Sequence, residues 1–304
     1  LAMNTSRPAF GSFLFGMGGF GWFTASLYWI ANALFVKGGI QLLLLPFVAL
    51  GLPILLSLFW VVAAYLALRL SVHIPTRLVL LACFWGVAEW LRSFLLTGFP
   101  WNVTGHIFVE NLRLAQMAAY TGEHGLNLLA GLFITSFSAL YLRAFSALTW
   151  MGVPVFLMLG LSIVRFSNLP PVDAQDSIIR LIQPNIAQIE KWDSARKSEH
   201  ISRMKKLASQ PAPPAMLTLL PEAAIAGFWR DEKDGVKALA RAITPINGVL
   251  LTGVLSSDSE KKIYNSAFFL HHSGGLLGQY HKQHLVPFGE YIPFRKIPFV
   301  SAIA

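Results

Sequence analysis

Residues 280–291 read "YHKQHLVPFGEY", and this stretch combines residue types that usually stay apart. Lys282 and Glu290 flank an apolar stretch, "LVPFG", at 285–289. A solvated loop gains nothing from valine and phenylalanine, and a buried strand excludes ionisable groups unless they are paired. We therefore expect a site loop whose apolar residues pack against a folded body, while its lysine and glutamate face a chemical site.

Charge is divided unevenly along the rest of the chain. The sequence has 304 residues and is 55% hydrophobic and 13% charged, whereas an ordinary soluble domain is about 25% charged. Residues 1–170 hold 8 Lys or Arg and 3 Asp or Glu, whereas residues 171–304 hold 16 and 12. This division predicts a multi-domain protein, with a transmembrane helical domain at 1–170 and a globular domain at 171–304.

Five stretches of the first domain are long and apolar enough to cross a hydrocarbon core of about 30 Å. They are 10–36, 40–70, 77–96, 126–142 and 148–164. With five crossings, the loops on one side carry four Lys or Arg and no acid, and those on the other carry three with two acids. The positive-inside rule then assigns the first side to the cytoplasm and puts the globular domain outside it.

Two polar features stand out in the first domain. Glu89 and Arg92 lie three residues apart on one face of the third predicted span, where they form either a structural ion pair or charges that line a pathway. The stretch "LLTGFPWNVTGH" at 95–106 follows directly and contains Trp101. Its glycine, proline and tryptophan residues predict an interfacial loop or a re-entrant segment that lines a cavity.

In the second domain, strand and helix patterns alternate. Strands are predicted at 177–186, 215–225, 247–257 and 263–272, and helices at 194–209 and 231–243. This order favours an α/β fold, in which catalytic groups gather at strand ends.

Three ionisable residues of this domain have unusual surroundings. Glu222 follows the apolar strand that ends in "TLLP", and Lys282 and Glu290 belong to the site loop. Taken one at a time, Glu222 is compatible with a cap, Lys282 with a snorkelling lysine and Glu290 with a surface acid. Together they favour a general base and an oxyanion-stabilising cation.

Other chemistries are less compatible with the sequence. The spacing of His271, His272, His281 and His284 fits no common zinc pattern, so we expect no metal and no cofactor. Cys83 is the single cysteine and lies within a predicted span, where a thiol is usually a small core residue. The net charge of +9 is spread over both domains without a run of like charges, which argues against nucleic acid as a partner.

Several motifs together resemble the apolipoprotein N-acyltransferase family, a membrane-bound branch of the nitrilase-like superfamily. They are "LLPEAAI" around Glu222, "YHKQHLVPFGEYIPF" around Lys282, "IEKWD" around Trp192, and "YWIANAL" and "LTGFPWN" in the first domain. The resemblance implies a polytopic α-helical membrane bundle followed by a nitrilase-like α/β sandwich. It also implies a bacterial inner-membrane protein whose catalytic domain lies on the periplasmic side.

The resemblance also implies roles for single residues. Glu222 would be the general base, Lys282 would stabilise the oxyanion, and Glu290 would be the family's second essential glutamate, which positions the lysine or the tetrahedral species. Trp192 would lie on a mobile arm and help to retain lipid. Trp192 and Trp101 are the substrate-binding candidates.

The implied reaction has two steps. A cysteine thiolate attacks an acyl ester of a phospholipid, and the α-amine of a diacylglyceryl-cysteine on a lipoprotein then takes the acyl group from the thioester. The phospholipid donor, the lipoprotein acceptor and the membrane are the expected partners of a monomer. The resemblance places the nucleophilic cysteine beyond Ala304. We therefore expect a truncated sandwich domain at 171–304 and a chain that is inactive alone.

Two alternatives remain compatible with the sequence. The first is a membrane-tethered nitrilase-type amidase, which would hydrolyse a small amide and form no N-acyl product. The second is a non-enzymatic transport or assembly protein, in which Glu89 and Arg92 would be pathway charges. In that case Glu222→Gln and Lys282→Ala would leave function intact.

Overall fold

The computed structural model describes residues 2–37, 39–170, 178–287 and 290–291. It divides into two compact units, Leu1–Pro171 and Val172–Ala304, and each unit is described by itself below. Phe288 and Gly289 of the predicted site loop lie outside the described residues, as do residues 292–294 of the longer motif and the beginning of the strand predicted at 177–186.

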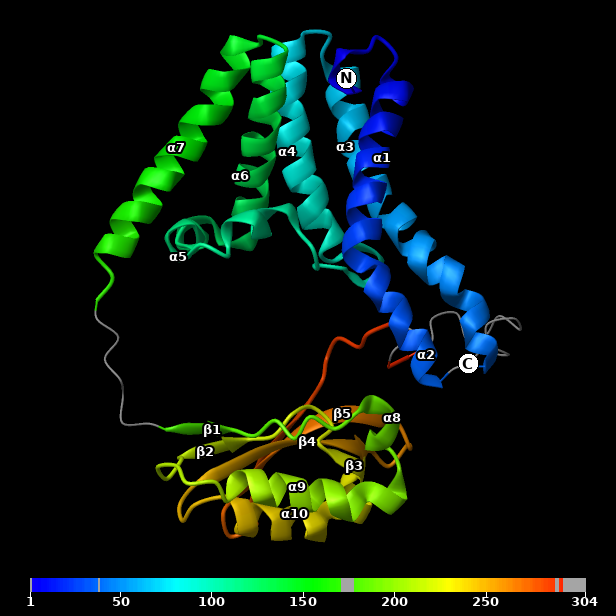
Figure 1. Ribbon diagram of the computed structural model, residues 1–304, viewed down its shortest axis with the longest axis vertical. Coiled ribbons are helices and arrows are strands. Elements are labelled where there is room, and N and C mark those ends of the chain that lie inside the picture. Colours follow the sequence, from blue (N-terminus) through cyan, green and yellow to red (C-terminus); the bar gives the residue numbers. More distant parts are fainter. Residues whose placement is uncertain (1, 38, 171–177, 288–289, 292–304) are drawn as a thin grey trace. The chain divides into compact units, whose positions relative to one another are not determined.

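The first unit is helical (Figure 1). Its α-helices are α1 (Pro8–Leu27), α2 (Ala33–Lys37), α3 (Leu52–Leu70), α4 (Ile74–Arg92), α5 (Leu112–Ala115), α6 (Ala118–Tyr141) and α7 (Phe145–Ser167). Short 3₁₀ turns lie at Ala2–Asn4, Tyr28–Asn32, Gly39–Leu44, Leu95–Thr97 and Thr104–Phe108, and a π-helical turn lies at Phe47–Gly51.

Four of the described helices are long and apolar enough to cross a membrane: Leu42–Leu70, Ile74–Arg92, Ala118–Tyr141 and Phe145–Ser167. They correspond to the second to fifth predicted spans. The first predicted span, 10–36, forms the 20-residue helix α1, a 3₁₀ turn and α2, and it is not among the four. The fifth crossing, and the sidedness that depends on it, therefore stay predictions.

The glycines of α1 explain its packing. A Cβ at Gly16 would lie 2.3 Å from Val61 Cγ2, and one at Gly19 would lie 2.8 Å from Trp60 Cε3. Both partners belong to α3, so these glycines allow the two helices to approach closely.

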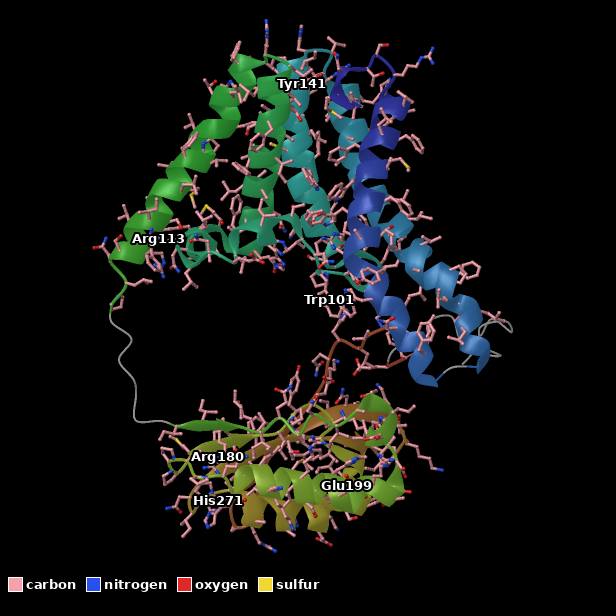
Figure 2. The ribbon with its side chains drawn as sticks, viewed as in Figure 1. Trp101, Arg113, Tyr141, Arg180, Glu199 and His271 are labelled. Atoms are coloured by element: carbon pink, nitrogen blue, oxygen red, sulfur yellow. The ribbon has the colours of Figure 1, made fainter. Side chains whose placement is uncertain are left out.

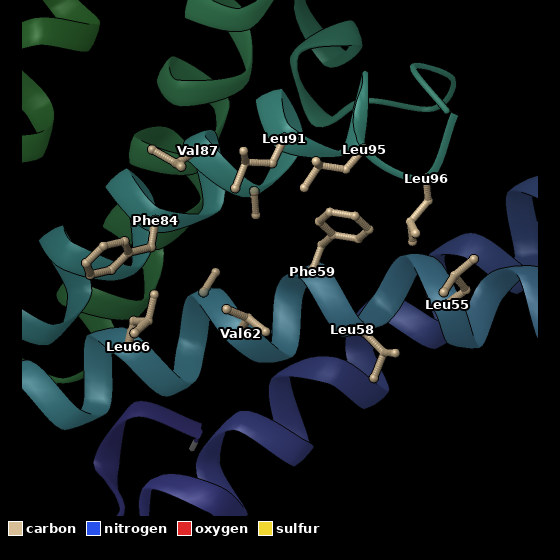
Figure 3. Close-up of a pocket in the computed structure, with 12 residues that line it drawn as sticks. Leu55, Leu58, Phe59, Val62, Leu66, Phe84, Val87, Leu91, Leu95 and Leu96 are labelled. Carbon is tan, nitrogen blue, oxygen red and sulfur yellow. The ribbon is translucent and has the colours of Figure 1, made fainter. Parts of the chain in front are cut away.

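An apolar groove of about 350 Å³ lies between α3 and α4 (Figure 3). Its lining side chains are all aliphatic or aromatic, and they include Leu55, Leu58, Phe59, Val62, Leu66, Phe84, Val87, Leu91, Leu95 and Leu96. A groove with this lining suits hydrocarbon rather than polar chemistry. It belongs wholly to the first unit.

The second unit is an α/β domain built on a mixed six-stranded sheet. Its strands are β1 (Ile179–Leu181), β2 (Leu217–Leu219), β3 (Ile225–Phe228), β4 (Val249–Ser257), β5 (Ile263–His271) and β6 (Leu276–His281). The strand order is β1-β2-β4-β5-β6, and β3 also pairs with β4. The pairs β1–β2, β2–β4 and β3–β4 are parallel, and the pairs β4–β5 and β5–β6 are antiparallel. The predicted fold class, membrane helices followed by an α/β domain, is confirmed.

Two predicted strands differ from the observed ones. The strand predicted at 177–186 is paired only over Ile179–Leu181, and Pro184 follows soon after. The strand predicted at 215–225 ends at Leu219, and β3 begins at Ile225. Pro221 separates them, because proline has no N–H to donate to a ladder.

Both long helices of this unit cover one face of the sheet (Figure 1). They are α9 (Lys197–Ala208) and α10 (Trp229–Ile243), and the shorter α8 (Gln188–Lys191) and a 3₁₀ turn at Ser194–Arg196 precede them. Val236 and Leu239 of α10 pack with Leu250 of β4 in the core. Trp229 stacks on Phe268 of β5 with ring centroids 4.2 Å apart. This packing fixes the strands whose ends carry the site.

Candidate active site

Glu222 lies on a tight turn between β2 and β3. The next residue, Ala223, has φ +46°, a left-handed conformation that costs a non-glycine residue about 1 kcal/mol or more. In β4, a Cβ at Gly253 would lie 2.2 Å from Ala223 N and 2.9 Å from Glu222 Cα. The β4 backbone therefore supports the turn directly, and the Glu222 side chain, 63% exposed, projects from it.

Lys282 directly follows β6 and lies between two carboxylates. Its Nζ is 3.3 Å from Glu222 Oε1 and 2.9 Å from Glu290 Oε2. Its backbone N–H donates to the carbonyl of Asn265 at 2.8 Å, so the end of β6 is tied to β5. The structure thus brings together the three residues that the sequence singled out, Glu222, Lys282 and Glu290.

Glu290 is held by its own loop. Its Oε2 accepts a hydrogen bond from the Val286 N–H at 2.8 Å, and its backbone N–H donates to the Val286 carbonyl at 2.9 Å. Pro287 and Tyr291 form an isolated bridge. The described part of the predicted site loop therefore turns back on itself and directs Glu290 toward Lys282.

Asn265 of β5 is a fourth member of the cluster, and sequence reasoning missed it. Its Nδ2 donates to Oε1 of Glu222 and, at 2.8 Å, to Oε1 of Glu290. One signal was available: Asn265 is an amide near the start of a strand, "IYNSAFFLH", that is otherwise mostly apolar. Strand position alone did not reveal that it faces both carboxylates.

The contacts favour the charged forms of Lys282 and Glu290. The hydrogen bond to Glu290 raises the pKa of Lys282 against the opposing effect of burial, and Glu222 adds to the increase. For Glu290, partial burial favours the neutral acid. Hydrogen bonds from Val286, Asn265 and Lys282 outweigh it and lower the Glu290 pKa. The cluster therefore presents a protonated Lys282 beside the ionised carboxylate of Glu290 near neutral pH.

Trp192 follows a second lysine that reaches the site. Lys191, the last residue of α8, donates from Nζ to the backbone carbonyl of Glu222 at 3.0 Å. Burial lowers the Lys191 pKa, although the charge of Glu222 opposes the decrease. Trp192 itself is 48% exposed. Trp192 is thus the chain neighbour of Lys191, which contacts the Glu222 turn directly.

Trp101 lies in the first unit, on the loop after α4 (Figure 2). It is 54% exposed, and its ring stacks on that of Trp29 with centroids 5.9 Å apart. Arg92 donates to the carbonyls of Phe99 and Trp101 at 2.6 and 2.8 Å. This arginine therefore fixes the position of the loop that carries Trp101.

Arg92 also pairs with Glu89 at 2.6 Å, and both side chains are 1% exposed. Trp60 Nε1 donates to Glu89 Oε1 at 2.8 Å, and the guanidinium lies 5.2 Å from the centre of the Phe23 ring. An ion pair enclosed in this way is a structural element. The geometry favours that interpretation over charges that line a pathway.

The other residues considered from the sequence were Cys83 and four histidines. Cys83 is in the middle of α4, nine residues from either end, which is about 14 Å along the axis. His281 Nδ1 contacts Ser266 Oγ at 2.7 Å. Over the ranges that the structure describes, no group of three or more His, Cys, Asp or Glu residues is placed to hold a metal ion.

Comparison with known proteins identifies both units. Residues 1–136 match the apolipoprotein N-acyltransferase N-terminal domain, and residues 178–301 match carbon-nitrogen hydrolase. A solved N-terminal amidase aligns over 36% of this chain and 28% of its own, with 19% identity and a TM-score of 0.29.

Curated relatives match across both units. Apolipoprotein N-acyltransferase of Allorhizobium ampelinum is 33% identical over 290 residues, 92% of this chain and 54% of the relative. That of Brucella suis is 33% identical over 91% of this chain and 54% of the relative, and that of Bradyrhizobium diazoefficiens is 35% identical over 92% and 55%. The chain thus spans about half the length of these relatives. With four candidate membrane spans and these matches together, the chain carries an apolipoprotein N-acyltransferase N-terminal domain followed by a carbon-nitrogen hydrolase domain.

Proposed function

We propose that this chain contributes to an apolipoprotein N-acyltransferase, which moves an acyl group from a phospholipid to the N-terminal amine of a diacylglyceryl-cysteine. The observation that carries the proposal is the cluster of Lys282 with Glu222 and Glu290 at 3.3 and 2.9 Å. It lies in a carbon-nitrogen hydrolase domain that is joined to candidate membrane spans. Relatives that match both parts carry that activity in their names.

In the first step, a thiol transfers its proton to the Glu222 carboxylate, and the thiolate attacks the ester carbonyl carbon of the phospholipid. The bond from this carbon to the glycerol oxygen breaks, and the oxygen takes the proton from Glu222 to leave as a lysophospholipid. The product on the protein is a thioester. Lys282, whose raised pKa keeps it protonated, stabilises the negative oxygen of the tetrahedral intermediate.

In the second step, the lipoprotein's amine nitrogen attacks the thioester carbonyl. Glu222 takes a proton from this nitrogen, the carbon–sulfur bond breaks, and an amide forms. The departing thiolate recovers the proton. Glu290, whose carboxylate stays ionised, keeps Lys282 directed at the reacting oxygen. Trp192 and Trp101 are proposed to contact lipid.

The sequence holds one cysteine, Cys83. It lies at the centre of a candidate membrane span in the first unit, whereas Glu222, Lys282 and Glu290 belong to the second unit. We therefore place the nucleophile outside these 304 residues, and the chain by itself would form no thioester.

The proposed location is the inner membrane of a bacterium, with the α/β unit on the periplasmic side and the protein acting as a monomer. The count of positive residues in the predicted loops supports this orientation. Both proposed substrates are lipid-linked, so a site joined to membrane spans can receive them without extracting either from the bilayer.

The direct test uses full-length protein in detergent or vesicles, a phospholipid with a radiolabelled acyl chain, and a diacylated lipopeptide. The proposal expects label in a hydroxylamine-sensitive protein adduct, then in the lipopeptide, and expects Glu222→Gln to abolish both. A membrane-tethered amidase would release ammonia from small amides and leave the lipopeptide unlabelled. A transport or assembly protein would yield no adduct, and Glu222→Gln would leave its function intact.

A further inference from the structure

Asn265 contacts every charged member of the cluster. Its Nδ2 donates to Oε1 of Glu222 and to Oε1 of Glu290, and its backbone carbonyl accepts from the Lys282 N–H. The pairing of β5 with β6 places Ser266 opposite His281, so Asn265 and Lys282 are neighbours across the strands. The sheet therefore fixes the position of this amide independently of the side chains it bonds.

The chemistry of the site explains why this residue is an amide. The Glu222 and Glu290 carboxylates lie on either side of Lys282, with the Lys191 ammonium at the backbone carbonyl of Glu222, and two carboxylates this close repel each other. A group that donates to both without adding charge relieves this repulsion. A primary amide nitrogen has two N–H donors, whereas a serine hydroxyl has one and an aspartate carboxylate has none.

The direction of the hydrogen bonds matters for proton transfer. In the described part of the chain, both side-chain hydrogen bonds to the Glu222 carboxylate end on Oε1, one from Asn265 and one from Lys282. Oε1 is thereby occupied by donors, and Oε2 is the oxygen available to receive a proton. Since Glu222 is 63% exposed, packing alone does not fix its rotamer.

We propose that Asn265 is a positioning residue: it bridges Glu222 and Glu290 on either side of Lys282 and directs Glu222 Oε2 toward the proton it transfers. This inference rests on the proposed acyl transfer, because it assigns Asn265 a part in that step. The bridging itself is independent of the reaction and is tested separately.

The first test is titration of full-length protein carrying ¹³Cδ-labelled glutamate, with Asn265→Asp, Asn265→Leu and Asn265→Ser compared with wild type. The Glu290 pKa rises in all three variants, most in Asn265→Asp, which adds a like charge, and least in Asn265→Ser, which keeps one donor. The matched control is Gln279→Glu, an amide-to-carboxylate change at an exposed position of β6. A Glu290 titration in Asn265→Ser and Asn265→Leu that equals wild type overturns the inference. If those variants do not fold, a Glu290 titration in Asn265→Asp that equals wild type overturns the inference instead.

The second test is kinetic. Loss of a hydrogen bond to a charged group predicts a kcat lower by about 10-fold to 100-fold in Asn265→Leu, with an unchanged KM for phospholipid and with partial recovery in Asn265→Ser. A raised KM with wild-type kcat would assign Asn265 to substrate binding and refute the positioning role. A wild-type protein that forms no N-acyl product would refute the proposed function instead, and the titration would still decide whether Asn265 bridges the carboxylates.

Discussion

Lys282 Nζ lies 2.9 Å from Glu290 Oε2, and each of these two groups favours the charged form of the other. Neither side chain is fully buried, since Lys282 is 33% exposed and Glu290 is 22% exposed. The pair therefore contributes about 1 kcal/mol or less to stability. Its main effect is to keep one ammonium in a fixed place with its proton.

The pH dependence of stability follows from these directions. The Glu290 pKa is lowered on folding, so its contribution is complete above about pH 4.3 and is lost as pH falls through the folded pKa. The Lys282 pKa is raised, so its contribution is complete below about pH 10.4 and is lost as pH rises through the folded pKa. The contribution of this pair, measured as the difference in thermal unfolding between wild type and Glu290→Gln by circular dichroism, should stay constant between these limits. Glu290→Gln should flatten the acid side, and an unchanged acid side would contradict the pairing.

Replacement of Lys282 by methionine removes the cation but keeps most of the side-chain volume. The proposed oxyanion role predicts a fall in kcat of about 10²-fold to 10³-fold for full-length protein, with a change in unfolding free energy of about 1 kcal/mol or less. Lys233→Met, at an exposed position of α10, is the matched control and should retain wild-type kcat. Acyl transfer by Lys282→Met at the wild-type rate would remove the lysine from the mechanism.

Gly253→Ala tests the support of the Glu222 turn. The new Cβ would lie 2.2 Å from Ala223 N. Because both sides of this contact are backbone, the clash should cost about 1–3 kcal/mol and displace Glu222. Gly278→Ala in β6 meets nothing within 4 Å and serves as the control in the same urea titration. Equal midpoints for the two variants would show that β4 does not support the turn.

The buried pair in α4 predicts strong coupling. Arg92→Met leaves Glu89 as an uncompensated charge and frees the carbonyls of Phe99 and Trp101, at a cost of about 3–5 kcal/mol. Glu89→Gln combined with Arg92→Met should recover part of this loss, which a double-mutant cycle of unfolding in detergent measures. Additive losses would mean that the two side chains do not act as a pair.

The sequence identified the site residues that a motif carries. Glu222 follows a strand and Lys282 and Glu290 share one loop, which singled these residues out, and the family resemblance implied that they act together. Asn265 was missed because its role depends on the register of β5 against β6 and on a turn more than forty residues earlier in the sequence. No spacing within one segment encodes that relationship.

The membrane unit shows a similar limit. Hydropathy identified the four candidate spans, but their boundaries shifted wherever a local feature intervened. For example, α6 begins at Ala118, eight residues before the predicted span, and continues through a kink at Gly122 with φ +65°. Hydropathy averages over a window and cannot register one backbone angle.

The spacing of Glu89 and Arg92 has a consequence for biogenesis. Because the two residues are one helical turn apart, the ion pair can form within α4 alone, before this helix meets any other. A nascent helix that leaves the ribosome would thus present a neutral pair, rather than two charges, to the lipid during insertion. The carbonyls of Phe99 and Trp101 follow Arg92 in the chain and would complete the guanidinium's hydrogen bonds once they too have left the ribosome.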